Sequence, residues 1–132
     1  MVRLLLATAL VAAIVGAASG PAPAKEKVVA RVLTPLPHDA KPGTRLTVVW
    51  TLSYVEAGER RPLSAIGVFI RLFGHGGSAP ARVYAAEPVP GRYRARVTVP
   101  RGGVRRVSIG LMGWNDDGPA PYAFPLAGDL IR

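Results

Sequence analysis

Alternation of apolar and polar residues with a period of two runs through the chain from residue 28 onward, and it predicts strands. The clearest segment covers residues 44 to 54, in which every second residue is apolar and most of the others are polar. Its apolar positions are Leu46, Val48, Trp50, Leu52 and Tyr54. Because successive side chains of a strand point to opposite faces, this pattern predicts a strand with one buried and one solvated face.

A second alternating segment covers residues 92 to 99. Its apolar positions are Tyr93, Ala95, Val97 and Val99, which we expect to face the core. Three arginines and a threonine occupy the positions between them. Residues 67 to 73 are apolar on both faces apart from Arg71, which is typical of a central strand.

Glycine and proline separate these segments from further short apolar runs. No sustained apolar period of 3.6 residues, as a helix would show, occurs in residues 25–132. The additional predicted strands are residues 28–33, 82–87, 104–112 and 122–126. Residues 56–62, 74–78 and 115–119 are predicted loops, and residues 100–103 a hairpin loop. About seven strands at this spacing predict an all-β fold, an immunoglobulin-like antiparallel β-sandwich.

The first 24 residues have the features of a secretory signal peptide. Arg3 precedes an apolar run over residues 4–18, and Ala22-Pro23-Ala24 supplies a small-x-small cleavage site. Cleavage after Gly20 is disfavoured because it would leave proline first, so we expect residues 25–132 to form the mature domain. The alternative is a retained anchor, although the run is shorter than the roughly 20 residues that span a bilayer.

The absence of cysteine removes disulfides and a lipoprotein anchor, so one domain of about 100 residues must be stabilised by burial alone. We expect a protein that is secreted or periplasmic, without a transmembrane segment after cleavage. The whole chain has 17 basic and 8 acidic residues; only Arg3 lies in the leader, which leaves the mature domain near +8. This excess favours anionic partners.

Arg92, Arg94 and Arg96 form the basic pattern with the clearest spatial logic. A strand projects residues at i, i+2 and i+4 onto one face about 7 Å apart. If Arg106 lies on the same side of a paired strand, it extends a cationic strip that could bind phosphates or carboxylates of an envelope polymer. The alternative is a solvated outer face without function. Nucleic acid is not expected, because aromatic stacking residues are not interleaved with the arginines.

Catalytic signatures are missing from the sequence. It has no cysteine, no Gly-x-Ser-x-Gly elbow and no lysine and serine or threonine after the glycine-rich residues 74–77. The consecutive residues Asn115, Asp116 and Asp117 predict an Asx-type turn rather than a calcium loop, because the later glutamate ligand is missing. We therefore expect a protein that is not an enzyme. Trp114, at a strand end, either covers one end of the sandwich or marks a contact surface.

Several segments resemble small exported bacterial immunoglobulin-like domains of the FixH/YtkA type. They are residues 42–43, 67–72, 91–104, 109–114 and 124–126. Within the third of these segments, residues 91–103 match a G-x-Y-x-A-x-V-x-x-P-x-G-G pattern. The resemblance covers most of residues 42–128. It implies the same fold, a location in the envelope, and an association with copper handling and oxidase assembly.

A copper site is the alternative function that this resemblance suggests. Its candidate ligands are His38, His75 and Met112, and the two histidines lie in loops that could meet at one end of a sandwich. The chain departs from metal-binding relatives because its expected mature N-terminus, Lys25, offers no histidine. The primary prediction is therefore a non-catalytic accessory module without a cofactor. Its partner would be an anionic polymer, a membrane surface or complex, or another envelope protein.

Overall fold

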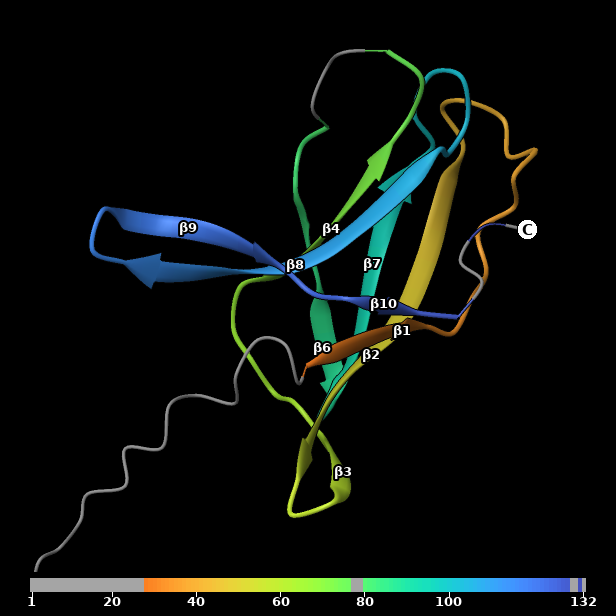
Figure 1. Cartoon of the computed structure of the whole chain (residues 1–132). Coiled ribbons are helices and arrows are strands. Elements are labelled where there is room, and N and C mark those ends of the chain that lie inside the picture. Colours follow the sequence, from red (N-terminus) through yellow and green to blue (C-terminus); the bar gives the residue numbers. More distant parts are fainter. Residues whose placement is uncertain (1–27, 77–79, 129–130, 132) are drawn as a thin grey trace, which may run out of the picture.

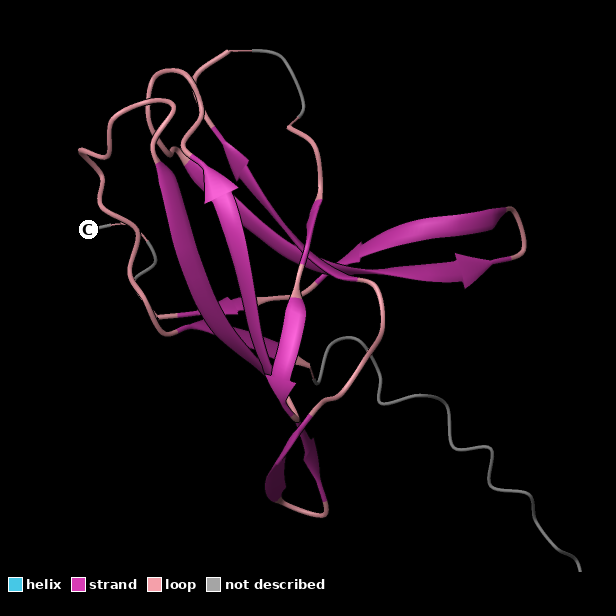
Figure 2. Ribbon diagram, turned by 180° about the vertical axis from the view of Figure 1, so that it is seen from behind, coloured by secondary structure: helices cyan, strands magenta, loops and turns pink. Residues whose placement is uncertain are grey.

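The computed structural model describes residues 28–76, 80–128 and 131, and in this part of the chain two β-sheets pack together without any helix (Figures 1 and 2). The predicted all-β, two-sheet architecture is confirmed. The predicted signal peptide and residues 25–27 lie outside the described residues. Within the described ranges, no helix is long and apolar enough to cross a membrane.

The first sheet has the strand order β10-β1-β2-β7-β6, with β3 paired to the far end of β2. Its strands are β1 (Val29–Val32), β2 (Arg45–Glu56), β3 (Glu59–Pro62), β6 (Ala86–Val89), β7 (Arg92–Thr98) and β10 (Leu126–Ala127). All neighbours are antiparallel except β1 and β10, which run parallel. The long β2 is the axis of this sheet, because β1 lies on one side of it and β7 followed by β3 on the other.

The second sheet has the order β5-β4-β8-β9 and is antiparallel throughout. Its strands are β4 (Val68–Phe73), β5 (Val83–Tyr84), β8 (Arg106–Asn115) and β9 (Gly118–Ala123). The apolar strand at residues 67–73 is central, as predicted, because β4 lies between β5 and β8. Its inward side chains Val68, Ile70 and Leu72 belong to the core.

The core between the sheets contains the apolar residues that the alternation predicts. Val48, Trp50 and Leu52 of β2 are fully buried, and the inward residues of β7 are buried beside them. The rings of Trp50 and Tyr93 stack with centroids 6.0 Å apart. Both predicted core aromatics are therefore confirmed, and they fill the centre of the sandwich.

Two predicted loops are shorter than expected, because the strands of two hairpins extend into them. Residues 56–62 form a tight hairpin in which β3 pairs with β2, and its turn residues Ala57 and Gly58 have φ angles of 50° and 80°. A positive φ at both turn positions matches the right-handed twist of a hairpin, but alanine rarely adopts it, so the sequence gives little sign of this turn. Of residues 115–119, Asp116 and Asp117 form the turn of the β8–β9 hairpin, whereas Asn115 ends β8 and Gly118 begins β9.

Two predicted connections are also wrong. Residues 82–87 do not form one strand: β5 pairs with β4 in the second sheet, and after Ala85 β6 pairs with β7 in the first. Residues 100–103 are not a hairpin loop, because β7 belongs to the first sheet and β8 to the second. The predicted strand 122–126 is interrupted at residues 124–125, between β9 and β10. The described chain therefore has ten strands instead of about seven.

The β8–β9 hairpin extends beyond the body of the sandwich as a two-stranded arm (Figure 1). Pairing between β4 and β8 ends at the pair Val68 and Leu111, whereas β8 and β9 stay paired to the turn. Trp114 lies on this arm with 78% of its surface exposed. Of the two predicted roles for Trp114, covering the end of the sandwich is therefore excluded.

Candidate functional site

The outer face of β7 carries the three arginines that the sequence places together. Arg92, Arg94 and Arg96 are exposed, and the residues between them are buried. The prediction that these three side chains share a solvated face is confirmed. Adjacent guanidinium groups start from Cα atoms that are about 7 Å apart along the strand.

Neighbouring strands add three further arginines to the same face. Arg45 of β2 pairs with Thr98 of β7, and Arg31 of β1 pairs with Thr51 of β2, which also pairs with Arg92. Directly paired residues project to the same side of a sheet. Arg60 of β3 reaches this side too, since its Nη1 donates a hydrogen bond to Ser53 Oγ at 2.9 Å. We call these six exposed residues the arginine face: Arg31, Arg45, Arg60, Arg92, Arg94 and Arg96.

The arginine face carries no acidic residue in its cross-strand ladder. The residues paired with the six arginines are Thr47, Val49, Thr51, Val55, Ala86, Val89, Thr98 and Ala127. Among the residues that the structure describes, ion pairs are formed by Arg61 with Glu56 and Glu59 and not by these six. From Arg45 to Val55, the β2 residue paired with Arg60, the face is about 33 Å long, at about 3.3 Å per residue.

Arg106 does not belong to this face, which corrects the prediction of a strip shared with Arg92, Arg94 and Arg96. It lies on β8 in the second sheet, and its guanidinium carbon lies 4.1 Å from the centroid of the Phe73 ring. Arg106 is separated from the three arginines of β7 because the connection after β7 carries the chain from one sheet to the other.

The turn at the start of β7 is fixed by a carboxylate. Gly91, with φ 77°, donates its backbone N–H to Glu87 Oε2 at 2.8 Å, and the Ser64 hydroxyl donates to both Glu87 oxygens at 2.8 Å. The bond from Gly91 is the largest cause of a lowered pKa of Glu87. This contact orients the β6–β7 turn, and with it the first arginine of β7.

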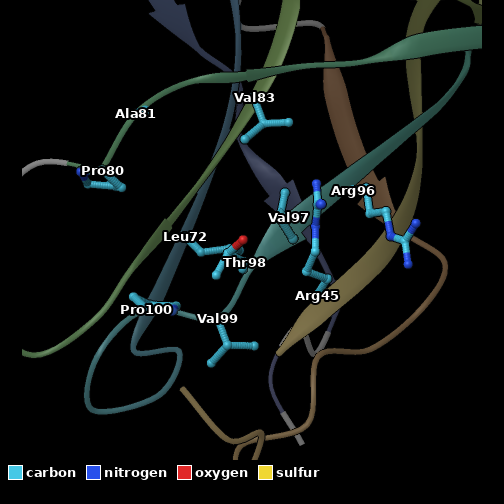
Figure 3. Close-up of a pocket in the computed structure, with 10 residues that line it drawn as sticks. All are labelled: Arg45, Leu72, Pro80, Ala81, Val83, Arg96, Val97, Thr98, Val99 and Pro100. Carbon is cyan, nitrogen blue, oxygen red and sulfur yellow. The ribbon is translucent and has the colours of Figure 1, made fainter. Parts of the chain in front are cut away.

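A groove of about 490 Å³ opens at the edge of the sandwich beside β7 (Figure 3). In the view of Figure 3, Arg45 and Arg96 lie on one side of it, and Pro80 and Ala81 on the other. Its further lining residues are Leu72, Val83, Val97, Thr98, Val99 and Pro100. The groove therefore joins an apolar interior surface to two cations of the arginine face.

The predicted copper ligands are only partly brought together. A β-carbon at Gly102 would lie 3.1 Å from the β-carbon of His75, and one at Gly103 would lie 3.7 Å from the backbone oxygen of His38, so both loops lie at one end of the sandwich. Met112 is far from this end. Arg106 begins β8 beside Phe73, close to the His75 loop, and Met112 follows Arg106 by six residues, or about 20 Å along the strand.

The surroundings of His75 do not favour a cation. Arg105 Nη1 lies 3.4 Å from His75 Nδ1. No group of three or more histidine, aspartate or glutamate side chains suited to a metal ion occurs in the described part of the chain. At the arm, Asn115 Oδ1 accepts a hydrogen bond from the N–H of Asp117 at 2.9 Å, which confirms the predicted Asx-type turn.

Sequence reasoning missed Arg31, Arg45 and Arg60 as members of the cationic surface. The alternation places Arg45 on a polar face, but only the pairing of β2 with β7 brings that face beside Arg92, Arg94 and Arg96. The sequence predicts a loop at Arg60, so it gives no cross-strand partner for this residue.

Comparison of the chain with protein-family models, curated proteins and solved structures finds no significant match in any of the three.

Proposed function

We propose that this protein is an exported, non-catalytic binding module of the bacterial cell envelope that holds an anionic polymer against its arginine face. The observation that carries the proposal is the set of six exposed arginines on one sheet, without an acidic residue in the cross-strand ladder between them. A guanidinium group binds phosphate and carboxylate oxygens through paired N–H donors, so regular spacing of such groups suits a polymer with repeated anions.

The strand order supports the finer assignment to the immunoglobulin-like sandwiches. One sheet contains β1-β2-β7-β6 and the other β5-β4-β8-β9. In chain order these correspond to the A-B-E-D and C′-C-F-G arrangement of that fold. The resemblance of residues 91–104 to exported domains of the FixH/YtkA type and the predicted leader at residues 1–24 support the same assignment and an envelope location.

The electrostatics of the arginine face favour a polymer over a single small anion. Each exposed guanidinium gains little from one contact in water, because solvent screens it. Several contacts along one chain add together, since the first contact raises the local concentration of the next anion. A face about 33 Å long is therefore expected to bind long polyanions much more tightly than their monomers.

Retention of the mature protein on immobilised long-chain polyphosphate tests the proposal. The test variant replaces Arg92, Arg94 and Arg96 by serine. The matched control, which loses the same charge, replaces Lys41, Arg101 and Arg105, which are exposed in the end loops. We expect the test variant to lose about tenfold or more in affinity at low salt, the control to lose much less, and the wild-type affinity to fall as NaCl rises.

Two results would overturn the proposed function. One is retention of the test variant equal to that of the wild type. The other is an equal loss in both variants, which would mean that net charge alone governs the interaction. Polygalacturonate, used in parallel, shows whether phosphate or carboxylate groups bind better.

A further inference from the structure

We propose that the free edge of β7 binds an extended peptide by strand addition, and that this peptide alternates apolar and acidic side chains. The inference goes beyond binding of a polymer to the flat arginine face, because it concerns the edge of the sheet and the groove behind it. Three independent features carry it: an open strand edge, an apolar slot and a pair of unneutralised cations.

The open edge follows from the pairing of β6. This strand pairs with β7 only at Arg92 and Arg94, so no strand of the described chain is hydrogen-bonded to that side of β7 beyond Arg94. Residues 80–81 and β5 lie across the groove from this edge without pairing with it. At its other side, Val99 donates its N–H to Thr44 and accepts a hydrogen bond from Gly43. Because the direction alternates along a strand, the N–H and C=O groups of Arg96 and Thr98 point to the open edge. Such a row of groups is a template for another strand.

The slot lies directly beside this edge. The groove continues inward between β7 and β4, where Leu72, Val83, Val97 and Val99 form its apolar lining (Figure 3). A strand added beside β7 directs every second side chain inward, at the level of Val97. The groove has a volume of about 490 Å³, which leaves room for small aliphatic side chains.

The positive charges of Arg96 and Arg45 determine which side chains are favoured at the outward-facing positions of the peptide. A residue opposite Arg96 projects outward with it, and Arg45 lies across Thr98 on the same face. Both arginines line the groove, and neither forms an ion pair with a described residue. An acidic side chain at this position is complementary to both guanidinium groups, whereas a basic one would be repelled.

The experiment uses a blocked, fluorescein-labelled hexapeptide of alternating valine and glutamate and measures its binding by anisotropy. The first control peptide has the same composition, with three valines followed by three glutamates. The second is the alternating peptide with N-methyl groups on the amides of one edge. We expect each control peptide to bind about tenfold more weakly. The block peptide cannot direct all its valines inward and all its glutamates outward in any register, and the N-methylated peptide cannot form the backbone hydrogen bonds to β7.

Two protein variants locate the site. Thr98→Pro removes an N–H from the open edge without removing a hydrogen bond to β2, and Ala81→Trp fills the groove from its exposed wall. We expect each to weaken binding of the alternating peptide by about tenfold, with unchanged retention on polyphosphate, so failure here is distinguishable from failure of the proposed function. If Thr98→Pro does not fold by circular dichroism, Ala81→Trp and the N-methylated peptide still decide.

Three outcomes would overturn the inference. Equal affinity for the alternating and block peptides would indicate attraction by charge only. Unchanged peptide binding by Ala81→Trp would place the site elsewhere. Binding of oleate that Ala81→Trp abolishes, together with no binding of the alternating peptide, would assign the groove to an acyl carboxylate instead of a strand.

Discussion

The hydroxyl of Tyr93 donates a hydrogen bond to the backbone carbonyl of Leu63 at a distance of 2.8 Å. The same oxygen accepts a hydrogen bond from the N–H of Ala65 at 2.9 Å. Leu63 and Ala65 belong to the segment that leads from β3 in the first sheet to β4 in the second. One buried side chain of β7 therefore satisfies two backbone groups of the crossover and fixes the path of the chain between the sheets.

Tyr93→Phe tests the importance of this contact for stability. The substitution keeps the ring that stacks on Trp50 but leaves the Leu63 carbonyl and the Ala65 N–H without their partner. We expect the free energy of unfolding to fall by about 1–3 kcal/mol, the usual cost of unsatisfied buried polar groups. Urea denaturation followed by tryptophan fluorescence measures it. Tyr84→Phe, at an exposed tyrosine, is the control, and equal stability of the two variants would contradict the prediction.

Alkaline pH should destabilise the protein through the same residue. Burial raises the pKa of Tyr93 from its ordinary value of 10.0 to about 12. Between these two values the folded state holds a proton that the unfolded state has released, so the free energy of unfolding falls as pH rises from 10 toward 12. We expect this part of the pH dependence to be absent in Tyr93→Phe. Parallel pH profiles of the two proteins would contradict it.

Acidic pH should also destabilise the protein, through Glu87, whose pKa is shifted in the opposite direction to that of Tyr93. Hydrogen bonds, above all from the Gly91 N–H, lower the pKa of Glu87 below its usual 4.5. Its contribution to stability is therefore complete above pH 4.5 and is lost as pH falls through the lower, folded-state pKa. We expect Glu87→Gln to be less stable than the wild type near neutral pH and to show a smaller loss on acidification. Thermal melting between about pH 2 and 7 measures both effects, and Glu59→Gln is the exposed control.

Gly110 should not tolerate a side chain. A β-carbon there would lie 2.7 Å from Cζ of Phe69 on β4 and would also collide with the backbone of Tyr122 on β9. Because one of these neighbours is backbone, the strain cannot be relieved by a rotamer change, and we expect Gly110→Ala to cost about 1–3 kcal/mol. Ser108→Ala, a half-buried position of the same strand, should change stability less. Chemical denaturation of both variants checks the difference.

The local faces of the strands could be predicted from the sequence because they depend on the two-residue period alone. This holds for Trp50 and Tyr93, which face the core, and for Arg92, Arg94 and Arg96, which face solvent. The all-β class follows in the same way, from alternating segments separated by glycine and proline.

The strand order could not be predicted, because it depends on pairing between segments that are distant in sequence. Arg106 follows Arg96 by only ten positions, yet it lies in the other sheet, whereas Arg31 joins the arginine face from much farther away. Ala85 carries no mark of the switch between β5 and β6. The complete arginine face and the groove depend on these pairings. The sequence therefore predicts the three arginines of β7 but neither the other members of the face nor the groove.

No third strand from the described residues lies beside the β8–β9 arm beyond Leu111, and the arm contributes little to the core. An isolated two-stranded ribbon is only marginally stable in water. Its amide protons should therefore exchange with deuterium by local fraying, long before those of β2 and β7, whose exchange requires global unfolding. The molecule would then carry its exposed indole on a segment that can adapt its shape while the arginine-bearing sheet stays rigid.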